Sequence, residues 1–269
     1  MTDSRIHETA IVAPGARLGA DCEVGPHAVI EDQVIVGDRC SIAAGAVLKR
    51  FTEIGNDNRI GEYAVLGGLP QDLKFKDQVS YLRLGDRNTI RESVTLHRAT
   101  AEGGETRIGN DTFLMAGCHV GHECRVGDHV IMANAALLAG HVQVGERAFL
   151  SGAAAVHQFC RIGRNTMVGG ASAIRQDVLP FTMTNGNPSR TIGLNLIGLK
   201  RSGFSSADIL ALKRALRLLF GPGLREERLH LVAAIDSPPV AELVQFIAGS
   251  KRGYCARRRR ASGADQGTD

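Results

Sequence analysis

The chain has 269 residues, of which 43% are hydrophobic and only 4% aromatic, and its formal net charge is +4. This length allows one sizeable core and a smaller appended unit. No window approaches the roughly eighteen uninterrupted apolar residues of a membrane span, and the first residues carry no apolar signal segment. We therefore expect a cytoplasmic protein without stable membrane insertion, and the mild charge does not favour nucleic-acid binding.

A period of six residues governs the chain from Ile6 to Ile174. Of the 29 positions at this spacing, 26 are apolar, where composition alone would give about twelve. Glycine often follows the apolar residue, as Gly121 follows Val120, and a small residue usually stands two places before it. Large and small inward residues alternating around tight turns predict a narrow prism with three short faces and about eighteen residues per coil.

Five of the six cysteines occupy the small inward position of this repeat. We expect them to be buried thiols that fill the core, not ligands, nucleophiles or disulfide partners. They are Cys22, Cys40, Cys118, Cys124 and Cys160.

The rhythm is interrupted where Asp72, Gln78 and Glu102 occupy positions that need an aliphatic side chain. Burial of an unpaired carboxylate is unfavourable, so segments near 68–83 and 97–106 are predicted to leave the prism as loops. The sequence Gln71-Asp72-Leu73-Lys74 is then free to contact a ligand, although a plain surface loop is the simpler alternative.

Residues eighteen apart are predicted to stack on successive coils, spaced like sheet strands at about 4.8 Å. His97 and His157 also replace the glycine that is expected after a hexad residue. Neutral imidazole accepts a proton near pH 7, so a histidine cluster suits general base catalysis. We place His122 at the centre of this candidate site. The residues that stack at one corner are His122, Glu123, Gly140, His141, His157 and Gln158.

Helical spacing replaces the six-residue rhythm in the last third of the chain. Ser205 to Asp208 form a capping box before a helix that continues to Phe220, and further helices are expected near 226–235 and 240–248. We predict a β-helix domain at 1–190, a helical domain at 191–253 and a disordered basic tail at 254–269. A basic surface that suits an acidic partner, or is simply solvated, comprises Lys200, Arg201, Lys213, Arg214 and Arg217.

The hexads resemble those of the hexapeptide-repeat proteins, which implies a mainly β fold, a left-handed parallel β-helix, followed by the small helical domain. The handedness comes from this resemblance, since the general rule for parallel crossovers predicts the right-handed form. Longer strings make the resemblance more specific. They are Gln71-Asp72-Leu73-Lys74, residues 90–98 (IRESVTLHR), residues 119–124 (HVGHEC), residues 155–159 (AVHQF) and Gly198-Leu199-Lys200-Arg201. Over about residues 6–253, the chain is similar to the acyl-carrier-protein:UDP-N-acetylglucosamine O-acyltransferase family of lipid A biosynthesis.

This resemblance implies a homotrimer with active sites between subunits. It implies transfer of a 3-hydroxyacyl group from acyl carrier protein to the 3-hydroxyl of UDP-N-acetylglucosamine, with no metal and no cofactor beyond the phosphopantetheine of the carrier. His122 matches the general base, followed by Glu123, the Gly140 N–H matches the oxyanion donor, and Gly170 matches the position that limits acyl-chain length. The expected substrate-binding residues are Asp72, Lys74, His97, His119, His141, His157, Gln158, Asn195 and Arg201.

Three residues depart from the family pattern: Glu123 stands where aspartate is more frequent, Ile197 replaces a frequent carboxylate, and Ser202 replaces an arginine. A related N-acyltransferase, or an acyltransferase for an amino-sugar nucleotide, remains an alternative. A zinc enzyme resembling the β-helical carbonic anhydrases, with His119, His122 and His141 as ligands, is a further alternative, as is a non-catalytic scaffold. Because His119 and His122 are three apart in an extended segment, they tend to point in opposite directions, which argues against shared ligation.

Overall fold

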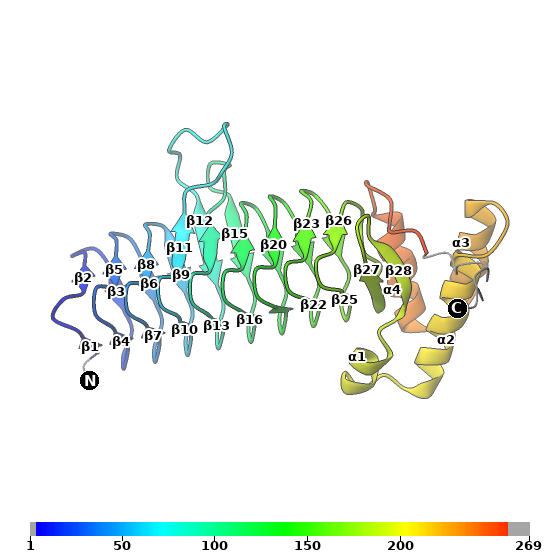
Figure 1. Ribbon diagram of the computed structural model, residues 1–269, viewed down its shortest axis with the longest axis horizontal. Helices are drawn as coiled ribbons and strands as arrows, with labels where there is room; N and C mark the ends of the chain where they lie inside the picture. Colours follow the sequence, from blue (N-terminus) through cyan, green and yellow to red (C-terminus); the bar gives the residue numbers. More distant parts are fainter. Residues whose placement is uncertain (1–3, 258–269) are drawn as a thin grey trace, which may run out of the picture.

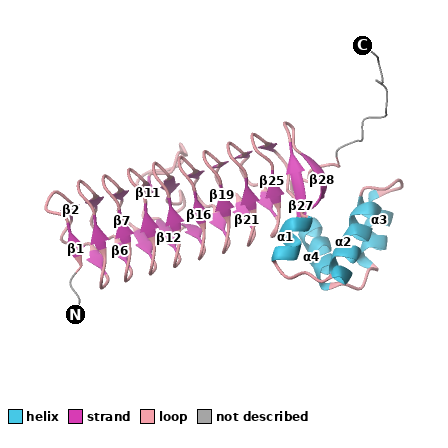
Figure 2. Ribbon diagram, turned by 60° about the horizontal axis from the view of Figure 1, so that its bottom comes forward, coloured by secondary structure: helices cyan, strands magenta, loops and turns pink. Residues whose placement is uncertain are grey.

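The computed structural model describes residues 4–257. Over these residues, short parallel strands wind into a left-handed β-helix of triangular cross-section, and helices gather at its C-terminal end (Figures 1 and 2). The predicted fold class is therefore confirmed. No helix within residues 4–257 is long and apolar enough to span a membrane.

The strands belong to three sheets, which we name A, B and C. Sheet A contains β1 (Arg5–Ile6), β4 (Glu23–Val24), β7 (Ser41–Ile42), β10 (Arg59–Ile60), β13 (Thr89–Ile90), β16 (Phe113–Leu114), β19 (Ile131–Met132), β22 (Phe149–Leu150), β25 (Met167–Val168), β27 (Thr182–Asn185) and β28 (Arg190–Leu194). Sheet B contains β2 (Ile11–Val12), β5 (Val29–Ile30), β8 (Val47–Leu48), β11 (Val65–Gly68), β14 (Thr95–His97), β17 (His119–Val120), β20 (Leu137–Leu138), β23 (Ala155–Val156) and β26 (Ala173–Ile174). Sheet C contains β3 (Arg17–Leu18), β6 (Ile35–Val36), β9 (Thr52–Ile54), β12 (Tyr81–Leu84), β15 (Glu105–Ile108), β18 (Arg125–Val126), β21 (Gln143–Val144) and β24 (Arg161–Ile162).

The hexad residues form the core of the prism because each pairs in register with the hexad residue of the next coil, as Val24 does with Ile42. They are buried from Val24 onward, whereas Ile6 at the open N-terminal end is 48% exposed. The five cysteines of the repeat are free and buried, as predicted. Burial raises the pKa of the Cys124 thiol to about 12, so this side chain is an inert filler of the core.

Two loops leave the prism between sheets B and C, at residues 69–80 and 98–104, and the first protrudes at the top of Figure 1. Both are shorter than the predicted 68–83 and 97–106. The reason is that β12 and β15 pair with each other from Tyr81 with Glu105 to Leu84 with Ile108. Their polar outward residues gave no sign of strand in the hexad pattern.

Before the helices, β28 pairs antiparallel with β27 and extends sheet A to Leu194. The helices are α1 (Leu196–Arg201), α2 (Ser206–Leu219), α3 (Arg225–Ala233) and α4 (Pro238–Ala248). Residues 254–257 are not a disordered tail, since Tyr254 bridges Asp177 and Cys255 is buried. The rest of the predicted tail lies outside the described residues.

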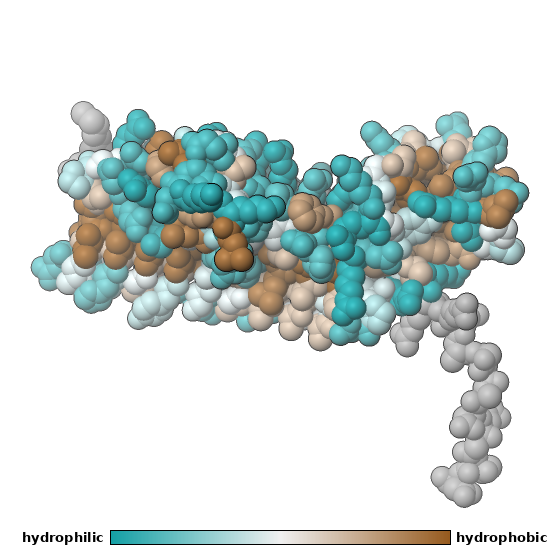
Figure 3. All heavy atoms as spheres, turned by 90° about the horizontal axis from the view of Figure 1, so that it is seen from above, coloured by the Kyte–Doolittle hydropathy of each residue, from teal (hydrophilic) through white to brown (hydrophobic). Residues whose placement is uncertain are grey.

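The three faces of the prism differ in their outward side chains. Sheet B is mainly apolar outside, with Ile11, Val29, Val47, Val65, Thr95, His119, Leu137, Ala155 and Ala173. Sheet C is mainly charged, with Arg17, Ile35, Glu53, Arg83, Arg107, Arg125, Gln143 and Arg161. Sheet A is polar near the N-terminus and becomes apolar at Phe113, Ile131, Phe149 and Met167. Hydrophobic side chains gather along one long side of the prism in Figure 3.

Candidate active site

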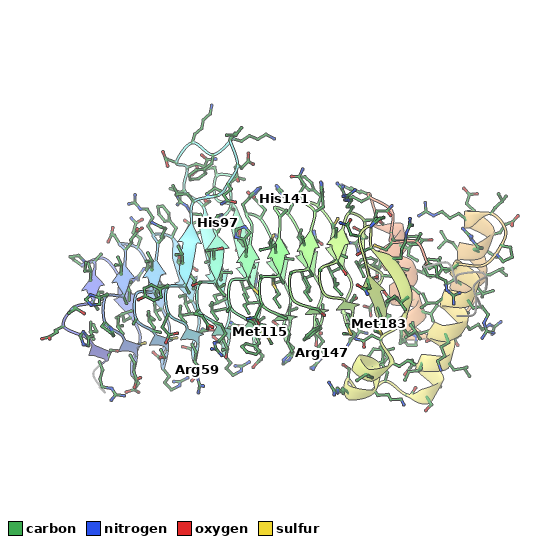
Figure 4. The ribbon with its side chains drawn as sticks, viewed as in Figure 1. Arg59, His97, Met115, His141, Arg147 and Met183 are labelled. Atoms are coloured by element: carbon green, nitrogen blue, oxygen red, sulfur yellow. The ribbon has the colours of Figure 1, made fainter. Side chains whose placement is uncertain are left out.

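The corner cluster lies on the edge of the prism where sheet B turns into sheet C. His122 follows β17, Gly140 follows β20 and Gln158 follows β23, so they stack on successive coils. Backbone hydrogen bonds between coils fix the stacking: the His141 N–H donates to the His122 carbonyl at 2.8 Å. Figure 4 shows His97 and His141 along this edge, with His97 at the base of the protruding loop.

His122 and Glu123 form a pair in which Nδ1 of the imidazole bonds Oε2 of the carboxylate. The other carboxylate oxygen, Oε1, accepts from the backbone N–H groups of Thr100 at 2.6 Å and Ala101 at 2.9 Å. Both side chains are mostly buried, with 13% and 15% exposed. Three hydrogen bonds therefore fix the carboxylate, and a fixed carboxylate on Nδ1 favours the tautomer whose Nε2 carries a free lone pair.

Gly140 faces the imidazole from the next coil. A Cβ at this position would overlap Cε1 and Nε2 of His122, so only glycine lets the ring approach the backbone this closely. Within the described residues, the Gly140 N–H donates no hydrogen bond. On the edge between sheets C and A the equivalent N–H, that of Asn110, donates to Asp128 Oδ1 at 2.7 Å. The glycine amide beside His122 is thus free for an oxygen atom of a ligand.

His141 lies beside this pair, with Nε2 3.8 Å from Glu123 Oε2 and its ring stacked on Phe159 at 4.5 Å. Among the described residues, His122, Glu123 and His141 could together hold a metal ion. This set differs from the predicted zinc alternative, because His119 does not belong to it. The three hydrogen bonds of Glu123 already use most of its lone pairs, which makes it a poor ligand.

His97 and His119 form a second pair, with ring centroids 4.7 Å apart and planes at 84°. Nδ1 of His119 hydrogen bonds Thr95 Oγ1 at 2.8 Å. Burial lowers the pKa of His97 to about 4, and the nearby His119 and His122 add to this shift. Burial also lowers the pKa of His119. Both rings are therefore neutral at pH 7 and can act as hydrogen-bonding groups toward a neutral sugar.

The other predicted residues are spread over the molecule. His157 and Gln158 are exposed on the same edge, and Asp72 and Lys74 lie on the 69–80 loop above it. Asn195 is buried, caps α1 by accepting from the Gly198 N–H at 3.1 Å, and donates to the Asn165 carbonyl at 3.0 Å.

Since Asn165 lies in the turn from sheet C to sheet A, Asn195 and Arg201 of α1 are associated with a different edge from His122. Gly170 follows β25 and lies on the third edge, between sheets A and B. One chain therefore does not gather the whole predicted set.

Sequence reasoning missed several groups that shape the site. The amides of Thr100 and Ala101 depend on a loop whose path the repeat does not predict. Thr95 and Phe159 could have been found, because Thr95 has the outward register of sheet B and Phe159 follows His141 by eighteen positions. The signal in both cases is the spacing of the repeat.

Comparison with known proteins agrees with this architecture. Residues 15–50 and 105–140 match the family model described as bacterial transferase hexapeptide (six repeats), and residues 177–255 match UDP N-acetylglucosamine O-acyltransferase, domain 2. A UDP-N-acetylglucosamine acyltransferase from Bacteroides fragilis has the same fold, with a TM-score of 0.90 and 37% identity, over 93% of this chain and 99% of that one.

Two curated relatives carry the name acyl-(acyl-carrier-protein) UDP-N-acetylglucosamine O-acyltransferase. The one from Thermodesulfovibrio yellowstonii is 42% identical over 261 residues, 94% of this chain and 99% of the relative. The one from Paraburkholderia phytofirmans is 45% identical over 258 residues, which cover 93% of this chain and 98% of the relative. Fold and site thus define a hexapeptide-repeat acyltransferase. The chain belongs to the UDP-N-acetylglucosamine O-acyltransferase family.

Proposed function

We propose that the protein transfers a 3-hydroxyacyl group from acyl carrier protein to the 3-hydroxyl of UDP-N-acetylglucosamine, the first step of lipid A biosynthesis, in the cytoplasm. The observation that carries the mechanism is the His122–Glu123 pair facing the free N–H of Gly140. A base and an oxyanion donor on adjacent coils are the two groups that acyl transfer to an alcohol needs. The only carrier group in this reaction is the phosphopantetheine of the acyl donor.

His122 acts as the general base in this proposal. Nε2 takes the proton of the sugar hydroxyl while the hydroxyl oxygen attacks the thioester carbonyl. Glu123 holds Nδ1–H and stabilises the imidazolium that forms. The carbonyl oxygen becomes an oxyanion and accepts from the Gly140 N–H. When the tetrahedral intermediate collapses, the C–S bond breaks and His122 returns the proton to the thiolate of the carrier.

A homotrimer would complete this site. In the described chain the apolar outward side chains of sheet B are exposed or half-buried, and those of the apolar half of sheet A are half-buried. If sheet B of one subunit packs on sheet A of the next, these faces are buried and the charged face of sheet C stays in water. The edge with His122 then comes beside the neighbour's edge with Asn195 and Arg201.

Acyl-chain binding fits the same arrangement. A path from His122 toward Gly170 crosses sheet B over the small or apolar side chains of Leu137, Ala155 and Ala173. Gly170 is exposed, and the nearest atom to a Cβ there would be the Gly152 carbonyl oxygen at 3.4 Å. A larger residue would fit and project outward, so its absence leaves room for a long acyl chain.

Basic side chains on the C-terminal part suit an acidic carrier protein. Lys213, Arg214 and Arg217 are exposed on one side of α2, and Lys200 and Arg201 are exposed on α1. A positive surface beside the active site speeds association with an acidic partner and makes it dependent on salt.

The test is the rate of acyl transfer to UDP-N-acetylglucosamine by His122→Ala. We expect kcat to fall about 10²- to 10⁴-fold, the usual contribution of a general base. His129→Ala is the control, since His129 lies outside the cluster and should leave the rate unchanged. A wild-type rate in His122→Ala would rule this residue out as the base.

A further inference from the structure

Arg98 is a buried cation that forms no direct ion pair within residues 4–257. The residue is only 3% exposed, and its Nε and Nη1 atoms are buried without a hydrogen bond. Burial lowers the pKa of its guanidinium, and the carboxylates of Asp77 and Glu31 act on it only from beyond ion-pair distance. A buried charge of this kind is unfavourable, and a stable fold would be better served by an apolar side chain. The position therefore needs an explanation beyond stability.

Two aromatic rings hold the Arg98 guanidinium. Its central carbon is 5.1 Å from the ring centroid of Phe51 and 5.1 Å from that of Phe75. Phe51 belongs to the prism, whereas Phe75 belongs to the 69–80 loop. The Arg98 N–H also donates to the carbonyl of Gly68, the last residue before the loop, at 3.0 Å. One residue thus fixes both the start and the middle of the loop to the prism.

The loop segment next to Phe75 carries Asp72 and Lys74. The Phe75 N–H donates to the Asp72 carbonyl at 3.0 Å, and the Lys74 N–H donates to Asp72 Oδ1 at 3.0 Å. Within residues 4–257, the segment 72–75 makes no hydrogen bond to the rest of the chain, and Leu73 at its tip is fully exposed. The position of Phe75 therefore determines where both polar side chains lie.

The residues after Arg98 continue to the catalytic pair. The Gly103 N–H donates to Val79 of the first loop at 2.7 Å, and Gln78 bonds the Thr100 carbonyl. Thr100 and Ala101 in turn donate to Glu123. Arg98 thus lies at the junction between the loop with Asp72 and the carboxylate that orients His122.

We propose that Arg98 is a positioning residue, which clamps the 69–80 loop through Phe75 so that Asp72 and Lys74 meet the sugar nucleotide beside His122. The substrate side of this inference rests on the proposed function. Arginine suits this position because its broad planar guanidinium lies over both rings at once, whereas an ammonium group is a compact point charge.

The test compares Arg98→Met, Phe75→Leu and Phe75→Tyr with wild type. We expect the KM for UDP-N-acetylglucosamine to rise about tenfold in the first two, because Asp72 and Lys74 lose their fixed position, with a smaller change in kcat. Phe75→Tyr keeps the aromatic ring and should retain the wild-type KM. Arg50→Met is the matched control, since Arg50 lies 5.2 Å from the same Phe51 ring but is exposed.

Hydrogen exchange of the Lys74 and Phe75 amides measures the clamp without substrate. It should become faster in Arg98→Met and Phe75→Leu while the melting temperature does not fall. Unchanged exchange, or an unchanged KM in folded Phe75→Leu, would overturn the proposal. If Arg98→Met does not fold, the KM and the hydrogen exchange of Phe75→Leu are sufficient to test the proposal. If the wild type does not use UDP-N-acetylglucosamine, the proposed function fails, and the exchange experiment still decides the clamp.

Discussion

Glu123 bonds the base with one carboxylate oxygen and the 98–104 loop with the other. Aspartate is one methylene shorter, and from the same backbone position it would not span both partners. Glutamate in place of the more frequent aspartate therefore has a structural reason, because the longer side chain connects the 98–104 loop to His122. The base, its orienting group and the loop form one connected hydrogen-bonded unit.

His97 makes the stability of the protein depend on pH. Its pKa is about 4 in the folded chain, below the ordinary value of 6.5. Between these values the unfolded chain binds more protons, so the free energy of unfolding is complete above pH 6.5 and falls as the pH drops toward 4. His119, whose pKa is also lowered by burial, acts in the same direction.

We expect the urea midpoint of the wild type to decrease between about pH 7 and about pH 5, and His97→Gln to decrease less over the same range. Urea unfolding at both pH values measures this. Equal decreases in the two proteins would show that His97 does not carry the dependence.

Among the elements, the coils were predictable and the loops only partly so. An aliphatic residue at every sixth position determines which side chains form the core of the prism. Asp72, Gln78 and Glu102 indicated where the chain departs from the prism. The number of residues in each excursion was hidden, because both insertions keep the hexads in phase: Ile60 pairs with Ile90, and Ile90 with Leu114. Stacking by eighteen therefore held for His122 and Gly140 but could not place His97 against His119.

Long-range pairings were also beyond the sequence. The bridge from Asp177 to Tyr254 and the burial of Cys255 join segments far apart, and no local pattern in the basic stretch distinguishes them from a solvated tail. Asn195 resembled a substrate-binding residue, and the structure adds a capping role that depends on Asn165. Local chemistry was sufficient at α2, whose capping box forms as predicted.

The N-cap of α2 should contribute to stability alone. Ser205 Oγ accepts from the Asp208 N–H at 3.1 Å, and the Ser205 N–H donates to Asp208 Oδ2 at 3.2 Å. We expect Ser205→Ala to lower the free energy of unfolding by about 1 kcal/mol, with kcat unchanged. Ser206→Ala, one residue into the helix, is the control. Denaturant unfolding measures the difference. Equal free energies of unfolding for the two variants would show that the Ser205 cap does not stabilise the protein.

At the scale of the whole molecule, the three edges of the prism carry different parts of the site. His122 and Gly140 share the edge between sheets B and C, whereas α1 with Arg201 is associated with the edge between sheets C and A. Sheet C, the charged face, separates these two edges in one chain. The apolar faces of sheets A and B explain how a neighbour could bring them together without exposing hydrophobic surface.

Mixed trimers test this arrangement directly. In the proposed trimer each site takes His122 from one subunit and Arg201 from the next, so His122→Ala and Arg201→Ala damage different halves. Random assembly of equal amounts leaves about one site in four with both halves intact. Co-expression should therefore restore about a quarter of the wild-type rate at low nucleotide concentration.

The control for this experiment is co-expression of His122→Ala with Gly140→Ala. Both residues belong to the same half of the site and come from the same chain. Every subunit in the mixture therefore carries a damaged base or a damaged oxyanion donor, and the rate should stay low. Restoration in the first mixture but not in the second shows that the cleft is shared between subunits. An inactive first mixture, in trimers shown by mass spectrometry to contain both variants, would mean that each chain builds its site alone.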